Sequence, residues 1–202
     1  MAFFIKGGRS MARLYLMRHG QTLFNQLKLI QGASDSPLTE LGIHQAGQAR
    51  RYFQAAGIEF DRLYSSTQER ASDTLEIVAP DREYQRLKGL KEWNFGLYEG
   101  SPEYLNPPAE EGKESYGSYF LTYGGESDEQ VAKRMNSTLT SIMDESLDDK
   151  VLSVSHGGAL YAFYLKWRKA SDIRPSFSNC CILVYDYHDG VFDLVESVNP
   201  GE

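Results

Sequence analysis

Two apolar segments of this chain end in the same dipeptide, His-Gly, and this coincidence constrains the fold most strongly. The first is "LYLMRHG", which ends at Gly20, and the second is "VLSVSHGG", which ends at Gly158. Short apolar runs bounded in this way are typical of strands buried in a sheet. In open α/β sheets, ligands bind where the carboxyl ends of the strands meet the loops. We therefore expect both His19 and His156 to lie at such an edge.

Strand and helix patterns alternate along the rest of the chain. Strands are predicted over 13–17, 61–66 and 150–155, helices over 36–57, 67–79 and 126–147, and a further helix after "SHGG". The last segments, "CILVYDY", "HDG" and "VFDLVESV", predict a closing hairpin. This order favours an α/β fold, a three-layer sandwich with a mostly parallel sheet and an antiparallel C-terminal edge strand.

Two segments fall outside this alternation. The stretch 93–125 is irregular and rich in Gly, Pro, Glu and Tyr, and it is interpreted as a lid insertion, because long loops within a domain are commonly functional. Residues 1–10 are expected to be a loose N-terminal extension or tag, and 11–202 a single domain.

Sequence details locate the helix ends and faces. Thr39 is predicted to be the N-cap of the helix over 36–57, and Ser127 with Gln130 forms a capping-box pattern at the start of the helix over 126–147. The apolar stripe expected on the first of these helices consists of Leu41, Ala46, Ala49, Phe53 and Ala56.

The composition restricts the kinds of partner. A net charge of −7 argues against nucleic acid or an anionic membrane as a partner, but it leaves room for a basic pocket that binds a small anion. The two cysteines, Cys180 and Cys181, are adjacent and cannot form an ordinary disulfide framework, which favours a reducing cytoplasm. No apolar run approaches the length of a membrane span, and the N-terminus is a poor signal peptide.

The two His-Gly segments belong to a longer ordered set of motifs. In chain order these are "RHGQT" with Asn25, "QGASDSPLTELGIHQA", "SSTQERASDT", "LKEWNFGLYEG", "GGES", "SHGG" and "SNC". The set resembles the histidine phosphatase superfamily, also called the phosphoglycerate mutase-like family, from Arg13 to about Val198. Departures are small: Gln21 stands where glutamate is common in that family and Tyr98 where tryptophan is common.

The resemblance implies a phosphoryl-transfer site. His19 would be the nucleophile, since a neutral imidazole can attack phosphorus and form a phosphohistidine. Arg18 and Arg70 would clamp the phosphoryl group, because the planar guanidinium makes paired bonds to phosphate oxygens. His156 would hold a phosphoryl oxygen. The ordinary alternatives are a hydrogen-bonded histidine at a strand end, a solvated arginine paired with Glu69 or Asp73, and a core or metal-binding histidine.

Glu92, in "LKEWNFGLYEG", is the residue that the resemblance selects as general acid and base, against the alternative of a surface glutamate. Asn25 is expected to donate to the phosphoryl oxygens, and Gln31 and Gly32 resemble a substrate-contacting turn. No cysteine or carboxylate stands at metal-ligand spacing near either histidine, so neither a metal nor another cofactor is expected.

Members of this family carry out two reactions, and the insertion distinguishes between them. A mutase needs cations that grip a second anionic group, but from residue 93 to 132 the only Lys or Arg is Lys113. The acidic residues of this region are Glu99, Glu103, Glu110, Glu111, Glu114, Glu126, Asp128 and Glu129. Such a lid is expected to repel a second anionic group. Its aromatic residues, expected to cover the pocket, are Tyr104, Tyr116, Tyr119, Phe120 and Tyr123.

These observations predict a cytoplasmic, metal-independent phosphatase that hydrolyses small phosphorylated metabolites through a phosphohistidine on His19. The protein is expected to be a monomer or homodimer. A cofactor-dependent phosphoglycerate mutase is the second interpretation, and a non-catalytic domain that binds phosphorylated ligands is the third.

Overall fold

A computed structural model describes residues 11–109, 111–112, 114–146 and 149–201; the expected extension at 1–10 lies outside this range. Its centre is a six-stranded sheet in the order β3-β2-β4-β1-β5-β6. The strands are β1 (Ala12–Arg18), β2 (Arg62–Ser66), β3 (Gln85–Leu87), β4 (Lys150–Ser155), β5 (Ile182–His188) and β6 (Val191–Val198). The first four of these strands run parallel, and β5 pairs antiparallel with both β1 and β6. The predicted mostly parallel sheet with an antiparallel C-terminal edge is therefore confirmed.

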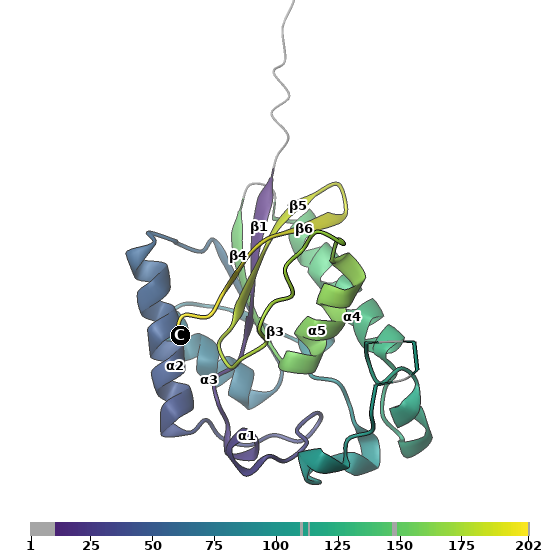
Figure 1. Cartoon of the computed structure of the whole chain (residues 1–202). Coiled ribbons are helices and arrows are strands. Elements are labelled where there is room, and N and C mark those ends of the chain that lie inside the picture. Colours follow the sequence, from purple (N-terminus) through teal and green to yellow (C-terminus); the bar gives the residue numbers. More distant parts are fainter. Residues whose placement is uncertain (1–10, 110, 113, 147–148, 202) are drawn as a thin grey trace, which may run out of the picture.

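Helices cover both faces of the sheet (Figure 1). The pair α2 (Glu40–Ala55) and α3 (Glu69–Val78) packs on one face, and the pair α4 (Asp128–Asp144) and α5 (Gly157–Trp167) packs on the other. Strand β1 shows why two cores form: Leu14 and Leu16 belong to the core under α4 and α5, whereas Tyr15 and Met17 belong to the core under α2 and α3. Because successive side chains of a strand point to opposite faces, a continuous apolar strand needs a layer on each side.

The observed elements differ from the predicted ones in detail. Thr39 caps α2 as expected, but Leu41 is 50% exposed and Ala56 lies beyond the helix end. Gly42 is buried at the start of the helix instead, where its backbone packs against that of Gln21. A side chain there would meet the Gln21 carbonyl oxygen, so the buried face begins one residue later than the apolar pattern indicates. Strand β3 and the short helix α1 (Leu23–Leu27) were not predicted.

The described residues of the insertion at 93–125 form three short 3₁₀ helices, Gly96–Tyr98, Glu103–Leu105 and Tyr119–Tyr123, and a fourth, Lys88–Leu90, precedes them. Phe120 is fully buried at its centre. The rings that contact Phe120 are Trp93, Phe95, Tyr98, Tyr116 and Tyr119, at centroid distances of 5.0–6.3 Å. The lid is therefore a small aromatic core packed against the sheet domain, and Tyr104 lies outside it with 84% of its surface exposed.

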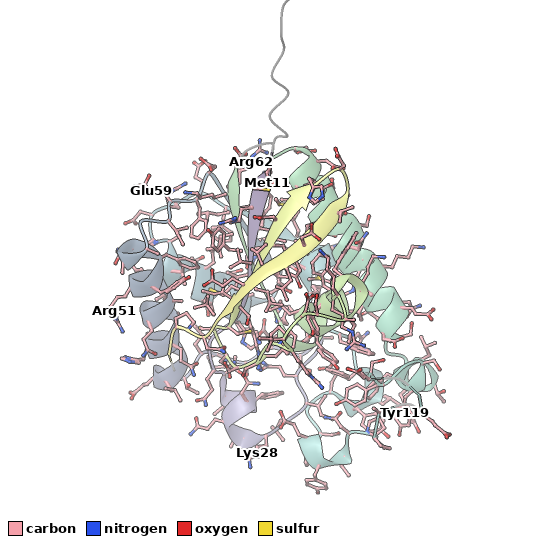
Figure 2. All side chains as sticks on the ribbon, turned by 45° about the horizontal axis from the view of Figure 1, so that its top comes forward. Met11, Lys28, Arg51, Glu59, Arg62 and Tyr119 are labelled. Atoms are coloured by element: carbon pink, nitrogen blue, oxygen red, sulfur yellow. The ribbon has the colours of Figure 1, made fainter. Side chains whose placement is uncertain are left out.

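The two ends of the sheet have different surroundings. Figure 2 shows Met11 and Arg62, which mark the starts of β1 and β2, at one end of the molecule, and Lys28 and Tyr119 at the other. The carboxyl ends of the parallel strands thus face α1 and the lid, as the alternating pattern predicts for a ligand site. Within the described part of the chain, no helix is long and apolar enough to cross a membrane.

The lid core generates a stability prediction. Phe120→Ala is expected to lower the free energy of unfolding by about 3–5 kcal/mol, because it removes a fully buried ring and leaves a cavity. The control Tyr104→Ala removes an exposed ring and is expected to change it by less than about 0.5 kcal/mol. Urea unfolding followed by circular dichroism measures both. Equal effects of the two variants would show that the lid unfolds separately from the domain.

Candidate active site

Strands β1 and β4 are neighbours in the sheet and bring the two predicted histidines together. Arg18 pairs with Ser155 in the parallel register, so His19 and His156 follow at the same level. The backbone N–H of His19 donates to the Ser155 carbonyl at 3.0 Å. The two imidazole rings lie edge to face with their centroids 5.2 Å apart. The repeated His-Gly pattern therefore does identify a single place in the fold.

Local hydrogen bonds fix the orientation of the His19 ring. Its Nδ1 lies 2.7 Å from the carbonyl oxygen of Gly20, whose own N–H donates to Thr74 Oγ1 at 3.0 Å. A carbonyl only accepts, so Nδ1 carries the proton and Nε2 holds the lone pair. Burial, followed by the charges of Arg70 and Arg18, keeps the pKa of His19 well below 6.5. His19 is thus a buried neutral imidazole with a free electron pair on Nε2.

His156 is fully buried at the N-cap of α5. Neither ring nitrogen hydrogen-bonds to any residue that the structure describes. Burial lowers the pKa of His156 well below 6.5, and the charge of Arg70 adds to the effect. A buried polar ring without a protein partner is costly, and such groups in native proteins commonly serve a ligand. The arrangement argues against a core histidine that is already hydrogen-bonded.

The Arg70 guanidinium is the buried charge beside both rings. Its Nε lies 3.3 Å from His19 Nε2, and Nη1 donates to the Asp35 carboxylate and the Ser34 carbonyl, each at 2.8 Å. Its Nη2 donates to the Gly32 carbonyl at 3.0 Å. The side chain has no exposed surface, so the alternative of a solvated arginine is wrong, and its acidic partner is Asp35.

Arg18 reaches the same place from the end of β1. Its Nη1 donates to the Phe177 carbonyl at 2.5 Å, and its buried Nε has no hydrogen-bond partner among the described residues. The first glycine after His156 makes this possible, since a Cβ on Gly157 would stand 3.1 Å from Arg18 Nε. A ligand phosphate is the kind of group that satisfies such an orphan N–H.

Glu92 is buried, with 8% of its surface exposed, and is held from several sides. Its carboxylate accepts the backbone N–H groups of Trp93, Gly158 and Ala159 at 2.7–2.9 Å. A Cβ on Gly158 would stand 2.8 Å from Glu92 Oε1, so the helix can approach this closely only with glycine there. The Gln68 side chain accepts the Glu92 N–H at 2.8 Å. The surface-glutamate alternative is therefore wrong.

A cavity of about 260 Å³ opens onto these groups. Its lining residues are Arg18, His19, Asn25, Leu29, Ile30, Gln31, Glu92, Phe95, Glu103, Asn106, Gly157, Gly158 and Phe177. Arg70 and His156 are fully buried beside His19 and do not line it. Of the described lid rings, Phe95 alone lines it, so the expectation that Tyr104, Tyr116, Tyr119, Phe120 and Tyr123 cover the pocket is wrong. Tyr116 and Tyr119 pack against Phe120, Tyr123 packs against Tyr98 and Tyr119, and Tyr104 is exposed.

The three predicted substrate-contacting residues occupy different places. Asn25 lines the cavity, and its Oδ1 accepts from Thr22 N–H and Asn179 Nδ2, so its amide NH₂ is the end that a phosphate can use. Gln31 also lines the cavity but its amide is bonded to the Thr22 hydroxyl. Gly32 does not line the cavity; its carbonyl accepts from Arg70.

Glu99 is a residue that the sequence reasoning counted only as a lid charge. Its carboxylate accepts the backbone N–H groups of Gly32, Ala33, Ser34 and Phe95 at 2.7–3.0 Å. It therefore shapes the loop whose carbonyls hold Arg70. Its position inside "LKEWNFGLYEG" was the available signal.

Arg134 of α4 is a second residue that the motifs did not reveal. Its Nη2 donates to the Glu92 carbonyl at 2.9 Å, and its Nε pairs with Glu126 at 2.8 Å. The backbone of Glu126 in turn accepts the Trp93 indole N–H at 2.7 Å. These contacts tie the segment that carries Glu92 to the helix layer. Glu126 lies in the "GGES" motif, but nothing in the sequence marked Arg134.

The described residues contain no group of three or more His, Cys, Asp and Glu side chains that could hold a metal ion. The site that they do form combines a neutral imidazole, two guanidinium groups, an unpartnered histidine and a buried carboxylate. This combination suits the transfer of a phosphoryl group, whose charge is spread over its oxygens.

Known proteins similar to this chain include a relative found by sequence and two solved structures. A Yersinia pestis protein named "Probable phosphoglycerate mutase GpmB" is 33% identical over 190 residues, which cover 89% of this chain and 86% of that protein. A phosphoglycerate mutase from Bacillus anthracis is 26% identical, with a TM-score of 0.82 and coverage of 95% and 94% of the two chains. The Entamoeba histolytica phosphoserine phosphatase in complex with 3-phosphoglyceric acid is 27% identical, with a TM-score of 0.74 and coverage of 92% and 96%.

These relatives include both mutases and phosphatases. The family model described as histidine phosphatase superfamily (branch 1) matches residues 14–200, which include every residue of the site above. The chain therefore belongs to the histidine phosphatase superfamily.

Proposed function

We propose that this protein is a phosphatase that hydrolyses small phosphomonoesters through a phosphohistidine on His19, without a metal ion. One observation carries the choice of reaction: Arg18 is the only cation among the described residues that line the cavity. Arg18, with Arg70 beside it, serves the phosphoryl group. No further described cation lines the wall where a mutase would hold the second anionic group of its substrate. The small cavity volume favours a compact leaving group.

In the first step, His19 Nε2 attacks phosphorus while its Nδ1–H stays bonded to the Gly20 carbonyl. The P–N bond forms as the P–O ester bond breaks, and Glu92 gives its proton to the leaving alcohol oxygen. The equatorial oxygens, whose charge rises in this step, are assigned to Arg18, which lines the cavity, and to Arg70 and His156, which the phosphoryl group meets as it closes on His19 beside them. Both histidines begin neutral, so the nucleophile keeps its lone pair and only the guanidinium groups meet the phosphate as full charges.

In the second step, a water molecule replaces the alcohol in the cavity. Glu92 takes a proton from this water molecule as the water oxygen attacks phosphorus. The P–N bond then breaks, and inorganic phosphate leaves with the His19 imidazole restored. One carboxyl group can act in both steps because the first leaves it ionised and the second protonates it again. The three backbone N–H groups and the Arg134 contact to its carbonyl keep Glu92 in place throughout.

The names of the relatives favour the second candidate, a cofactor-dependent phosphoglycerate mutase. The decisive experiment measures inorganic phosphate release from a panel of phosphomonoesters, including 3-phosphoglycerate, with chelator present. We expect release by the native protein and a loss of at least about 10³-fold in His19→Ala. A mass shift on His19 after mixing with a phosphoester would report the intermediate directly.

The other outcomes identify the alternatives. Interconversion of phosphoglycerates on addition of bisphosphoglycerate, without net release, would make the protein a mutase. Sensitivity to chelator would contradict metal independence. Binding of phosphoesters with neither release nor transfer would leave a ligand-binding domain.

The role of Glu92 predicts a dependence on the leaving group. Glu92→Gln is expected to lower kcat/KM for alkyl phosphates by about 10²–10⁴-fold, because their leaving oxygen needs a proton. For p-nitrophenyl phosphate the loss is expected to be much smaller, since its leaving group is a weak base. Glu59→Gln, an exposed glutamate at the opposite end of the sheet, is the control (Figure 2). Equal losses for both substrates would show that Glu92 positions the site and transfers no proton.

The buried state of His19 predicts a pH profile. Burial and the nearby guanidinium groups oppose protonation, so the pKa of His19 lies well below 6.5 and the lone pair persists as the pH falls through that value. We therefore expect kcat/KM for p-nitrophenyl phosphate, corrected for ionisation of the substrate, to stay level through pH 6.5 and to decline only well below it. An acidic limb with its midpoint at 6.5 would contradict a neutral, buried nucleophile.

A further inference from the structure

The cavity is also lined by two hydrogen-bond acceptors outside the phosphate site, Glu103 and Asn106. They lie at the two ends of one short turn, because Glu103–Leu105 is a 3₁₀ helix and Asn106 N–H donates to the Glu103 carbonyl at 3.0 Å. Neither residue belongs to the set that the family motifs select. Their chemistry differs from that of the phosphate site, so they suit a different part of a ligand.

The backbone holds this turn in a defined place. Glu103 N–H donates to the Lys28 carbonyl at 2.8 Å, and Ile30 N–H donates to the Ser101 carbonyl at 2.8 Å. Leu29 and Pro102 form an antiparallel bridge between these two bonds. The segment after α1 and the start of the lid therefore form a short ladder, which sets Glu103 at the cavity rather than on a free loop.

Three other acidic residues of the lid make their contacts elsewhere. Glu99 is bonded to four backbone N–H groups, Glu126 pairs with Arg134, and Glu114 pairs with Arg168. Glu103, in contrast, lines the cavity and pairs with no basic group among the described residues. Of the described acidic residues in this insertion, Glu103 is the one that lines the cavity.

Asn106 adds an independent sign of a ligand. Its Oδ1 is buried and accepts no hydrogen bond from any described residue. An unsatisfied buried acceptor is costly, and a donor on the ligand would satisfy it. A carboxylate and an amide oxygen together accept from a donor but repel a second anion. Two of the remaining wall residues, Phe95 and Phe177, present aromatic rings, which also tolerate a cation.

We infer that the leaving group of the natural substrate carries an ammonium, which Glu103 and Asn106 recognise while the phosphoryl group lies against His19. The substrate class is thus an aminoalkyl phosphomonoester. This inference rests on the proposed phosphatase function and specifies its leaving group.

Three esters with the same two-carbon leaving group test the inference: phosphoethanolamine, 2-hydroxyethyl phosphate and 2-phosphoglycolate. They present an ammonium, a hydroxyl and a carboxylate at the same position. We expect kcat/KM to fall in that order, with about a tenfold or larger difference between the first and the last, and the difference to shrink as salt is added. The p-nitrophenyl phosphate activity of each preparation normalises for active enzyme.

Variants assign the preference to residues. Glu103→Gln is expected to lower kcat/KM for phosphoethanolamine about tenfold and raise it for 2-phosphoglycolate, and Glu103→Lys to reverse the order. Asn106→Ala is expected to weaken the ammonium and hydroxyl esters alike, because it removes an acceptor without changing charge. The matched control is Glu111→Gln, which removes a carboxylate from the same insertion but does not line the cavity.

The outcomes separate this inference from the proposed function. If p-nitrophenyl phosphate is hydrolysed but the three esters are not ranked by charge, the inference is wrong and the phosphatase function stands. The same conclusion follows if Glu111→Gln changes the order as much as Glu103→Gln does. Failure to release phosphate from any ester, p-nitrophenyl phosphate included, overturns both.

Discussion

The buried guanidinium of Arg70 is the interaction on which the rest of the site depends. Removing a full charge from water is expensive, and the cost is offset only by an opposite charge and complete hydrogen bonding. Asp35 supplies the charge, and the carbonyls of Gly32 and Ser34 supply acceptors. Those carbonyls are presented correctly because Glu99 holds the N–H groups of the same loop. Glu99, in the lid, therefore helps to hold the guanidinium of Arg70, on α3, in place.

The same charge reinforces what burial does to both imidazoles. Burial first, and the charge of Arg70 second, lower the pKa of His19 and of His156, so both rings are neutral beside the guanidinium. The parallel pairing of β1 with β4 then places the two neutral rings at one level of the sheet. Fold and electrostatics therefore act together: the sheet register places the rings, and burial with the charge of Arg70 keeps them neutral.

The parts of this arrangement that the sequence predicted share a property: their signals are local. Each can be recognised within a few residues: one apolar strand ends in Arg18-His19, a second ends in His156, and glycines follow His156. Gln68 was missed for the opposite reason. It accepts from Glu92 N–H and donates to the Gly32 carbonyl, and both partners are distant in sequence. A polar residue that bonds to backbone has no partner side chain that a motif can reveal.

Charge counting in the lid shows a related limit. From the sequence, the eight acidic residues between 93 and 132 are expected to form one repulsive surface, yet those that the structure describes differ in what they contact. Glu99 builds the Arg70 loop and Glu126 anchors the segment of Glu92, so these charges stabilise the site and do not meet a ligand. The folded structure, and not the sequence, distinguishes these two residues from Glu103, which lines the cavity.

The site therefore has two parts, one at the phosphate and one formed by Glu103 and Asn106. The groups assigned to the phosphoryl group stand at the ends of β1 and β4 and at the starts of α3 and α5. The groups proposed to meet the leaving group stand on the ladder between residues 28–30 and 101–103 and on the turn that follows it. Changes at Glu103 and Asn106 are expected to alter this part of the cavity, since neither side chain hydrogen-bonds to His19 or Glu92. A superfamily whose members are both mutases and phosphatases is what such a separation allows, because the reaction partner is chosen on loops and the chemistry is retained in the sheet.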